Sequence, residues 1–439
     1  METPLRTVPG PRSKRAKVGR IGLRDGVADV LTLVGAIVAV VVTFSALVSR
    51  LDLGFALPLG YLLAVPAAIA GAMLTLIWTI PLRSHDILSV RSRFSRSESR
   101  NIDVQSPALT ISVIVPVYNG REYLTKSLPP LLEAVGRGEI LEVLVADDGA
   151  TDGSAEYARE LGAKVISSGG RKGPGEARNV ASKFAKGDVL WFIDADVVIA
   201  DDSPGVLARS FGDPALVAVF GSYDDRPAGE NFASQYKNLV HHHYHQNANP
   251  NATTFWSGCG AVRAAAFAAV GGFDGVEYGM PSVEDIDLGC RLREAGGQIF
   301  LNRDLLSTHL KVWSIFEVVR TDVFRRAIPW ARMMLRRDEI IDDLNVGTTE
   351  RLRAAYAGLT AIAIVAAAFR FVPWWFLAAV LTTNVAANWH LFKMFVGRRG
   401  LLFGAAGLVF HQVYYLYSSA AFVACWLEVR VFTREAFTV

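Results

Sequence analysis

Long apolar stretches lie near both ends of the 439-residue chain and enclose a more polar middle region. In residues 27–48 the only charged residue is Asp29, and residues 54–82 contain none. Each stretch can cross a bilayer core of roughly 30 Å as a helix, so we expect two spanning helices in residues 27–82. Three further crossings are expected in residues 354–427, in the apolar stretches 354–369, 371–392 and 401–427.

Basic residues gather beside these stretches, in an N-terminal arm, a linker and a later loop: residues 1–26, residues 83–107, and Lys393 with Arg398 and Arg399. The positive-inside rule then predicts that the arm and residues 83–353 are cytoplasmic. The first apolar run is too long for a signal peptide and lacks a small-residue cleavage site, so we interpret it as a retained anchor. We expect an integral protein of a bacterial or archaeal plasma membrane, with residues 428–439 as a C-terminal tail.

The net charge of +3 does not indicate a nucleic-acid partner. The basic residues flank the predicted spans, where anionic membrane lipids are the natural partners. The three cysteines show neither metal-ligand spacing nor a pairing pattern, which is typical of a reducing compartment; they are Cys259, Cys290 and Cys425.

Residues 108–312 alternate apolar runs with segments of helical periodicity, which predicts an α/β fold. Parallel strands are expected from the apolar runs, joined by right-handed crossovers, in residues 111–119, 141–149, 163–168, 188–196 and 216–223. Residues 313–350 alternate apolar residues with arginines, as amphipathic helices at a membrane interface do.

Polar residues follow the first three predicted strands, at the edge where open α/β sheets bind ligands. Carboxylates there can accept hydrogen bonds from a base or a ribose. The glycine-rich segment "GGRKGPGEARN" adds cations and close backbone N–H groups, which suit a diphosphate. The resulting donor-binding candidates are Pro116, Tyr118, Asn119, Asp147, Asp148, Lys172 and Arg178.

Two acidic motifs complete the candidate chemistry. In "FIDAD", Asp194 and Asp196 offer the hard oxygen ligands that Mg²⁺ or Mn²⁺ prefers, although a solvated turn has the same composition. In "SVEDIDLG", Glu284 and Asp285 precede an expected helix over residues 287–295, and a carboxylate close to a sugar hydroxyl can act as general base. Acidic residues are also favoured in the first turn of a helix by its dipole.

Six motifs in order, "ISVIVPVYNG", "VLVADDGATDGS", "GPGEARN", "FIDADV", "GGFDG" and "EDIDLGCRL", resemble the family 2 glycosyltransferases. The resemblance covers about residues 108–310. It implies a nucleotide-sugar-binding domain of the GT-A fold, with a Rossmann-like mixed sheet, flanked in this chain by transmembrane helices. It also implies inverting transfer of a sugar from a nucleoside-diphosphate sugar. Val283 stands where many members have threonine.

The same resemblance implies a role for each motif residue. Asp148 and Asp147 would contact the nucleoside, and Arg178 or Lys172 the diphosphate. Asp194, also near the donor, would bind the metal with Asp196. Asp285 would be the base, beside Glu284. His309 would be a third metal ligand or a diphosphate contact, with a structural role as the alternative, and the acceptor would meet Gly258, Cys259 and Trp330.

Three features leave alternatives open. Processive polysaccharide synthases carry an Arg-Trp pair in a late motif, but "RAIPW" has Pro329 at the arginine position, so Trp330 could stack on a sugar or anchor the chain at the membrane. The run His241 to His245 is interpreted as a polar loop or acceptor-cleft surface rather than a metal site. "SGCG" could line the acceptor cleft or be a turn.

We therefore expect a metal-dependent hexosyltransferase that uses a nucleoside-diphosphate sugar. Its acceptor would be lipid-linked or membrane-bound, because both ends of the catalytic region are tied to predicted spans. A processive polysaccharide synthase with a transmembrane channel is the alternative.

Overall fold

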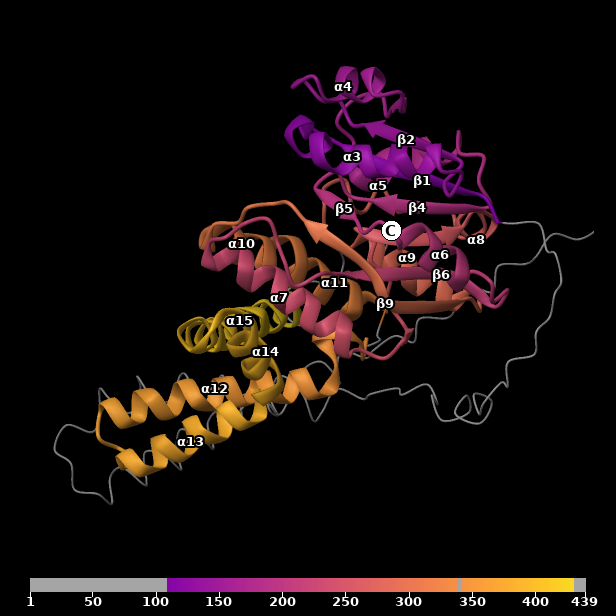
Figure 1. Cartoon of the computed structure of the whole chain (residues 1–439). Coiled ribbons are helices and arrows are strands. Elements are labelled where there is room, and N and C mark those ends of the chain that lie inside the picture. The colour runs from indigo at the N-terminus through magenta and orange to yellow at the C-terminus, as the bar shows by residue number, and fades with distance from the viewer. Residues whose placement is uncertain (1–108, 338–340, 430–439) are drawn as a thin grey trace, which may run out of the picture. The chain divides into compact units, whose positions relative to one another are not determined.

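The computed structural model describes residues 109–337 and 341–429, all within one compact unit. The predicted spans in residues 27–82, and the basic arm, the basic linker and most of the C-terminal tail, lie outside the described residues. Figure 1 gives the element labels used below.

A single mixed sheet organises the described residues, in the order β3-β2-β1-β4-β8-β6-β9-β5, with β7 paired to β9. Its strands are β1 Ile111–Val117, β2 Glu142–Asp147, β3 Lys164–Ser167, β4 Val189–Ile193, β5 Val197–Ile199, β6 Leu216–Tyr223, β7 Asn251–Ala252, β8 Cys259–Arg263 and β9 Gln298–His309. All five predicted strand regions contain strands; the fourth contains β4, and β5 follows directly after that region.

The prediction of parallel strands is correct for the five predicted strands but not for the whole sheet. Strands β3, β2, β1 and β4 are parallel neighbours, and β6 pairs in parallel with β9. Strand β8, which the sequence analysis did not predict, runs antiparallel to both of its neighbours, β4 and β6. Apolar runs reveal burial but not strand direction, so the sequence pattern could not show this reversal. The mixed sheet implied by the family resemblance is the one observed.

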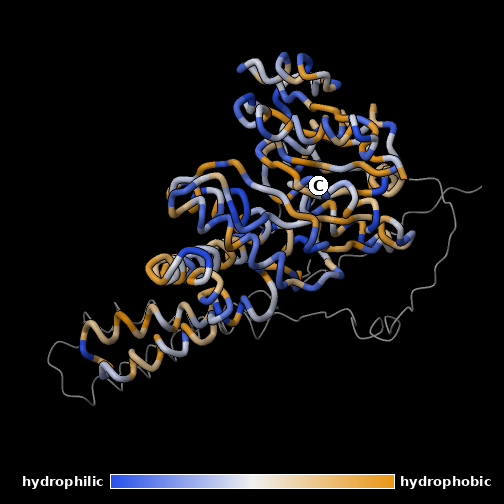
Figure 2. Tube along the Cα trace, viewed as in Figure 1, coloured by the Kyte–Doolittle hydropathy of each residue, from blue (hydrophilic) through white to orange (hydrophobic). Residues whose placement is uncertain are grey.

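The buried strands account for the core. Every residue of β1 and of β4 is buried, which is the pattern of strands covered on both faces. Figure 2 shows these strands as hydrophobic segments. Asp194 and Asp196 follow β4 directly, so the packing of β4 in the core fixes the backbone positions of these two residues.

Helices cover the sheet and continue beyond it. Those between the strands are α3 Arg121–Gly136, α4 Ser154–Glu160, α5 Pro174–Ser182, α6 Ser203–Ser210, α7 Phe232–Asn247, α8 Ala264–Ala269 and α9 Glu284–Glu294. Helix α9 begins three residues before the predicted start at residue 287, so Glu284 and Asp285 lie in its first turn. The histidine run, predicted as a loop or cleft surface, belongs to α7.

The segment after β9 is helical, as predicted for residues 313–350, and includes a π-helix. Its elements are α10 Ile315–Thr321, the π-helix η2 Asp322–Ala327, α11 Ile328–Arg337 and the short 3₁₀ helix η3 Leu344–Val346. Trp330, Met333 and Met334 of α11 pack against Ile286 of α9. This contact joins the segment to the acidic helix.

The C-terminal apolar stretches form four helices: α12 Thr348–Ala368, α13 Trp374–Ala387, α14 Trp389–Arg399 and α15 Leu401–Leu427. The predicted continuous stretch 371–392 is divided at Asn388, and the predicted basic loop at Lys393 lies in α14. Among the described residues, α12 is the one helix long and apolar enough to qualify as a membrane span. Figure 1 shows α12 and α13 side by side.

Helix α9 packs at Gly289 directly against the backbone of Phe255, and this contact positions the helix. A Cβ atom at Gly289 would lie 2.5 Å from the backbone nitrogen of Phe255, in the segment that leads to Ser257. We expect Gly289→Ala to lower the free energy of unfolding by about 1–3 kcal/mol, because α9 or the backbone must shift. Thermal or denaturant unfolding of the full chain measures this loss.

Gly136→Ala is the matched control. No atom lies within 4 Å of a Cβ at this α3 position, so alanine should leave stability unchanged or raise it by up to about 1 kcal/mol. Equal unfolding midpoints for the two variants would contradict the close packing of α9.

Candidate active site

A cavity of about 740 Å³ lies between the ends of β1 and β4, helices α7 and α9, and the helices that follow β9. Its lining includes most of the residues singled out in the sequence: Pro116, Tyr118, Asn119, Asp148, Arg178, Asp194, Asp196, Glu284, Asp285, His309 and Trp330. Four others do not line it: Asp147, Lys172, Gly258 and Cys259. The fold thus brings residues from seven separate segments of the sequence to one place.

Asp148 organises the glycine-rich loop. Its buried carboxylate accepts backbone hydrogen bonds from Lys172 at 2.8 Å and Gly173 at 2.9 Å, and a third from the hydroxyl of Ser168. Gly173 has a φ of 92°, and a Cβ there would lie 2.5 Å from the carbonyl oxygen of Gly279. Asp148 therefore shapes the loop in front of α5.

Two neighbouring candidates, Asp147 and Lys172, do not line the cavity. Asp147 accepts a hydrogen bond from the backbone nitrogen of Ala150 and so closes the turn after β2. In the loop, Arg171 rather than Lys172 lines the cavity, with its guanidinium 4.3 Å from the centre of the Tyr118 ring. Sequence reasoning missed Arg171 because either cation of the Arg-Lys pair could face the site.

Arg178 is a buried cation between two acidic motifs. Its Nη2 donates to Asp194 Oδ1 at 2.5 Å, and its Nη1 lies 3.7 Å from Glu284 Oε1. The side chain is only 3% exposed, and its Nε and Nη1 have no hydrogen-bond partner among the residues that the structure describes. Because an unsatisfied buried donor is costly, these groups favour an anionic ligand beside α5.

Glu284 and Asp285 sit in different environments despite their adjacency. Burial, together with the negative charge of Asp285, raises the pKa of Glu284 to about 7 against the opposing effect of Arg178. Glu284 also accepts a hydrogen bond from the backbone nitrogen of Ser282. Glu284 is thus placed to hold Arg178 and the turn before α9.

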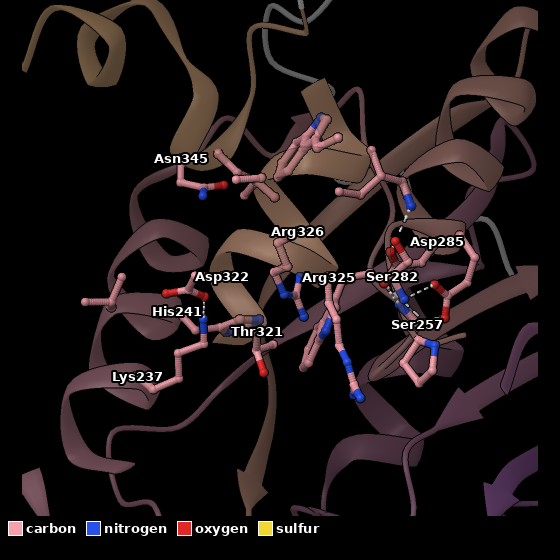
Figure 3. Close-up of a pocket in the computed structure, with 18 of the residues that line it drawn as sticks. Lys237, His241, Ser257, Ser282, Asp285, Thr321, Asp322, Arg325, Arg326 and Asn345 are labelled. Atoms are coloured by element: carbon pink, nitrogen blue, oxygen red, sulfur yellow. Dashed lines mark hydrogen bonds and ion pairs between the residues drawn. The ribbon is translucent and has the colours of Figure 1, made fainter. Parts of the chain in front are cut away.

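Asp285 is oriented by hydrogen bonds to both of its oxygens. Oδ2 accepts from the backbone nitrogen and the hydroxyl of Ser257, and Oδ1 accepts from the backbone nitrogen of Ile286. Figure 3 shows Asp285 and Ser257 together at one side of the cavity. A carboxylate held in this way at a cavity wall can receive a proton from a bound hydroxyl.

Asp194, Asp196 and His309 meet at the other wall. His309 Nε2 lies 3.5 Å from Asp196 Oδ2, and Tyr223 stacks on the His309 ring at 4.5 Å. Burial and the charges of Asp196 and Asp285 raise the pKa of Asp194, although Arg178 opposes them. A cation between these carboxylates would relieve that repulsion.

The described residues contain no ready-made group of three or more His, Cys, Asp or Glu ligands for a metal ion. Two carboxylates and an imidazole nevertheless suit Mg²⁺ or Mn²⁺, because such ions are commonly held by one or two carboxylates plus substrate phosphates. The donor set therefore fits a metal that binds together with a phosphate ligand.

Of the three predicted acceptor residues, one lines the cavity and two do not. Trp330 lines the cavity and is only 5% exposed, so it is not an exposed membrane anchor. Cys259 is fully buried in β8, and burial raises the pKa of its thiol to about 12. Gly258 accepts the backbone hydrogen bond of Asp194 through its carbonyl, so "SGCG" supports the metal motif from behind.

Cations from α7 and η2 were not assigned to the site from the sequence. Arg325 and Arg326 extend into the cavity, and Lys237 lies beside Asp322 (Figure 3). Nearby, neither ring nitrogen of His241 has a hydrogen-bond partner within residues 109–337 and 341–429. The sequence shows these arginines close to Trp330, but it does not indicate whether an arginine faces a cavity or the surface.

Residues 112–271 match the family model described as Glycosyl transferase family 2. This match confirms the predicted resemblance over that segment. The segment contains the motifs predicted to bind the donor and the Asp194-Asp196 motif, whereas Glu284 and Asp285 lie after it.

Curated relatives are also glycosyltransferases. The glycosyltransferase GlyG of Streptococcus pneumoniae is 26% identical over 118 residues, which are 26% of this chain and 38% of that protein. The pre-mycofactocin glycosyltransferase of Mycobacterium tuberculosis is 29% identical over 203 residues, 43% of this chain and 40% of that protein. The matches span less than half the length of these relatives.

A solved structure shares the fold. It is the mannosyltransferase PcManGT from Pyrobaculum calidifontis, solved in complex with GDP-Man and Mn²⁺, with a TM-score of 0.51 and 19% sequence identity. The similarity covers 82% of this chain and 99% of that chain. It therefore extends beyond the segment that matches the family model.

The loop geometry yields a prediction for Asp148. In Asp148→Asn the amide nitrogen would face the N–H groups of Lys172 or Gly173, so the loop should lose its shape. If this loop binds the donor substrate, its KM should rise about tenfold with little change in kcat, as expected for one lost charge-assisted hydrogen bond. Steady-state kinetics with varied donor measures both constants.

Asp147→Asn provides the control, because Asp147 lies outside the cavity lining and holds a single turn hydrogen bond. Its donor KM should change about twofold or less. Equal effects of the two substitutions would argue against the loop-shaping role of Asp148.

Proposed function

We propose that this protein is a metal-dependent, inverting glycosyltransferase that moves a sugar from a nucleoside-diphosphate sugar to a lipid-linked or membrane-bound acceptor at the cytoplasmic face of a membrane. The observation that carries the proposal is the single cavity. Its lining combines the strand-end carboxylates, cations without partners, and residues of the apolar helices α12 and α15.

The donor fits the sheet side of the cavity. Tyr118, stacked by Arg171, and Asn119 border the place where a nucleoside would lie. Arg178 presents unsatisfied N–H groups, which suit a diphosphate. The two curated relatives described above are named as glycosyltransferases, and the PcManGT structure contains a nucleotide sugar, which supports the same donor class here.

Asp194 and Asp196, with His309 nearby, would hold Mg²⁺ or Mn²⁺. When bound, the ion supplies positive charge that stabilises the leaving diphosphate. The Mn²⁺ in the PcManGT complex supports this assignment. Arg178 keeps Asp194 in place, and the stack of Tyr223 on His309 keeps the imidazole beside Asp196.

Asp285 is proposed as the general base. It would accept the proton of an acceptor hydroxyl while the hydroxyl oxygen forms a bond to the anomeric carbon. The bond from that carbon to the diphosphate oxygen breaks at the same time, and the nucleoside diphosphate leaves with the electron pair. Attack from the face opposite the leaving group inverts the configuration at the anomeric carbon.

Away from the sheet, the cavity lining combines cations with apolar residues. Arg325 and Arg326 make no hydrogen bond or ion pair with any other residue that the structure describes, and both line the cavity. The lining also includes Ala354 and Ala355 of α12 and Phe422 of α15. This combination suits an acceptor that carries both an anionic group and a hydrocarbon chain.

Removal of the metal should abolish transfer. With Asp196→Asn, or with wild-type protein in excess EDTA, we expect turnover to fall to background, and Mn²⁺ or Mg²⁺ should restore only the chelated wild-type protein. Release of nucleoside diphosphate measures turnover, and unchanged thermal unfolding would show that the variant is folded. Full activity in EDTA would refute the metal assignment.

Asp285→Asn should lower kcat by about 10²- to 10⁴-fold with little change in donor binding, as expected for loss of a general base. Glu284→Gln should have a milder effect if Glu284 mainly orients Arg178. If Asp285→Asn retains near wild-type transfer, the acceptor group is an already ionised phosphate, or Asp285 is not the base.

The acceptor class can be tested by supplying a labelled nucleotide sugar with membrane lipid extract. UDP-, GDP- and dTDP-sugars should be screened, and we expect label to enter the organic phase with wild-type protein but not with Asp196→Asn. Arg326→Gln should reduce this transfer more strongly than it reduces slow hydrolysis of the donor. Label found only in a long water-soluble polymer would favour the processive synthase instead.

A further inference from the structure

A second pocket, of about 370 Å³, lies between α7 and α14 and shares no lining residue with the large cavity. Helix α7 separates the two, since it contributes His241 and Tyr244 to the large cavity but His242 and His243 to the small one. The full lining is His242, His243, Gln246, Asn247, His390, Lys393, Met394, Gly397 and Arg398.

The ionisable side chains that line this α7–α14 pocket are all basic. The lining contains five basic side chains and no carboxylate. Arg398 is paired at 2.8 Å with Asp225, which does not line the pocket. Lys393 is exposed and has no ion pair with any described residue. The pocket therefore has an uncompensated positive charge at its mouth.

Polar groups continue into the pocket floor. His243 is 8% exposed, and burial with the nearby charges of Arg353 and His390 lowers its pKa to about 4. A neutral imidazole keeps one N–H donor without adding a buried charge. The amide of Gln246 lies in the same lining, and Asn247 donates to the carbonyl of His243. Cations at the mouth and neutral donors below suit a phosphate group.

The surroundings of α14 indicate where such a phosphate would come from. Leu391 and Phe395 pack on α7, which fixes α14 to the catalytic domain. Trp389, the first residue of α14, is 50% exposed, and Leu402, at the start of α15, is 88% exposed. Exposed aromatic and apolar residues beside cations are the arrangement of helices that lie at the surface of an anionic membrane.

We propose that the α7–α14 pocket binds a phosphate-bearing anion, supplied by the headgroup of an anionic phospholipid. Lys393 and His390 contact the phosphate, and Gln246 and His243 donate from the floor. The inference does not depend on the proposed sugar transfer. Because α7 also carries Lys237 and His241 into the large cavity, a bound headgroup would brace the wall of that cavity from behind.

Thermal unfolding of the detergent-solubilised full chain tests the pocket. The probes are short-chain phosphatidylglycerol, short-chain phosphatidylcholine and inorganic phosphate, each titrated separately. A ligand that binds only the folded protein raises the unfolding midpoint, and above its Kd the rise grows with the logarithm of the ligand concentration. We expect phosphatidylglycerol to raise the midpoint, and phosphatidylcholine and inorganic phosphate to have little effect.

Lys393→Gln and His390→Ala should each weaken the phosphatidylglycerol effect, about fivefold in apparent affinity for the lysine, as expected for one cation near an anionic surface. Arg320→Gln removes one charge from α10, outside the pocket, and should leave the effect intact. The two pocket variants should share the wild-type midpoint without lipid.

Each outcome is informative. If inorganic phosphate alone raises the midpoint and Lys393→Gln removes that rise, the pocket is supported and its ligand is a soluble phosphate. If neither phosphatidylglycerol nor inorganic phosphate raises the midpoint, the pocket does not bind phosphate and the proposal is refuted. The proposal is also refuted if the rise survives in both pocket variants. An equal loss in Arg320→Gln would also refute it, because the effect would then be general charge attraction.

Discussion

The buried guanidinium of Arg178 connects the parts of the candidate active site. It belongs to α5, yet it contacts Asp194 after β4 and Glu284 at the start of α9. A buried cation is tolerated only when acidic or polar groups surround it. Burial and the neighbouring carboxylates raise the pKa of Asp194, and Arg178 opposes that rise, so the ion pair favours the charged form of Asp194. The positions of the metal motif and the acidic helix are therefore linked.

Further polar contacts extend this linkage to the C-terminal helices. Asp322 of η2 is buried and contacts Lys237 of α7, and it also accepts a hydrogen bond from Tyr417 of α15 at 2.8 Å. Tyr244 of α7 donates to Glu350 of α12 at 2.9 Å. The apolar helices are thus tied to the cavity wall by specific hydrogen bonds. These contacts explain how residues of the sheet and residues of the apolar helices come to line one cavity.

The π-helix η2 gives the two unpaired arginines their position. π-Helical turns are uncommon and occur frequently at functional sites. With Asp322 fixed at its start and Trp330 buried soon after its end, the intervening Arg325 and Arg326 are directed into the cavity. Helical periodicity in the sequence predicted helices here, but a local change of hydrogen-bond register has no comparable sequence signal.

Much of the catalytic half could be predicted from local patterns. Buried apolar runs predicted the strands, and the polar residues after them predicted Asp148 and Asp194 as cavity residues, because strand ends share one sheet edge. The glycine-rich segment predicted Arg178, and the acidic motif before an expected helix predicted Asp285. The sequence by itself also determined the apolar character of residues 354–427. Only the tertiary structure decided that β8 runs antiparallel between β4 and β6, that Arg171 rather than Lys172 faces the cavity, and that Cys259 does not. The first outcome is the direction of a strand, and the other two are the orientations of side chains. Contacts between distant segments of the chain determine both.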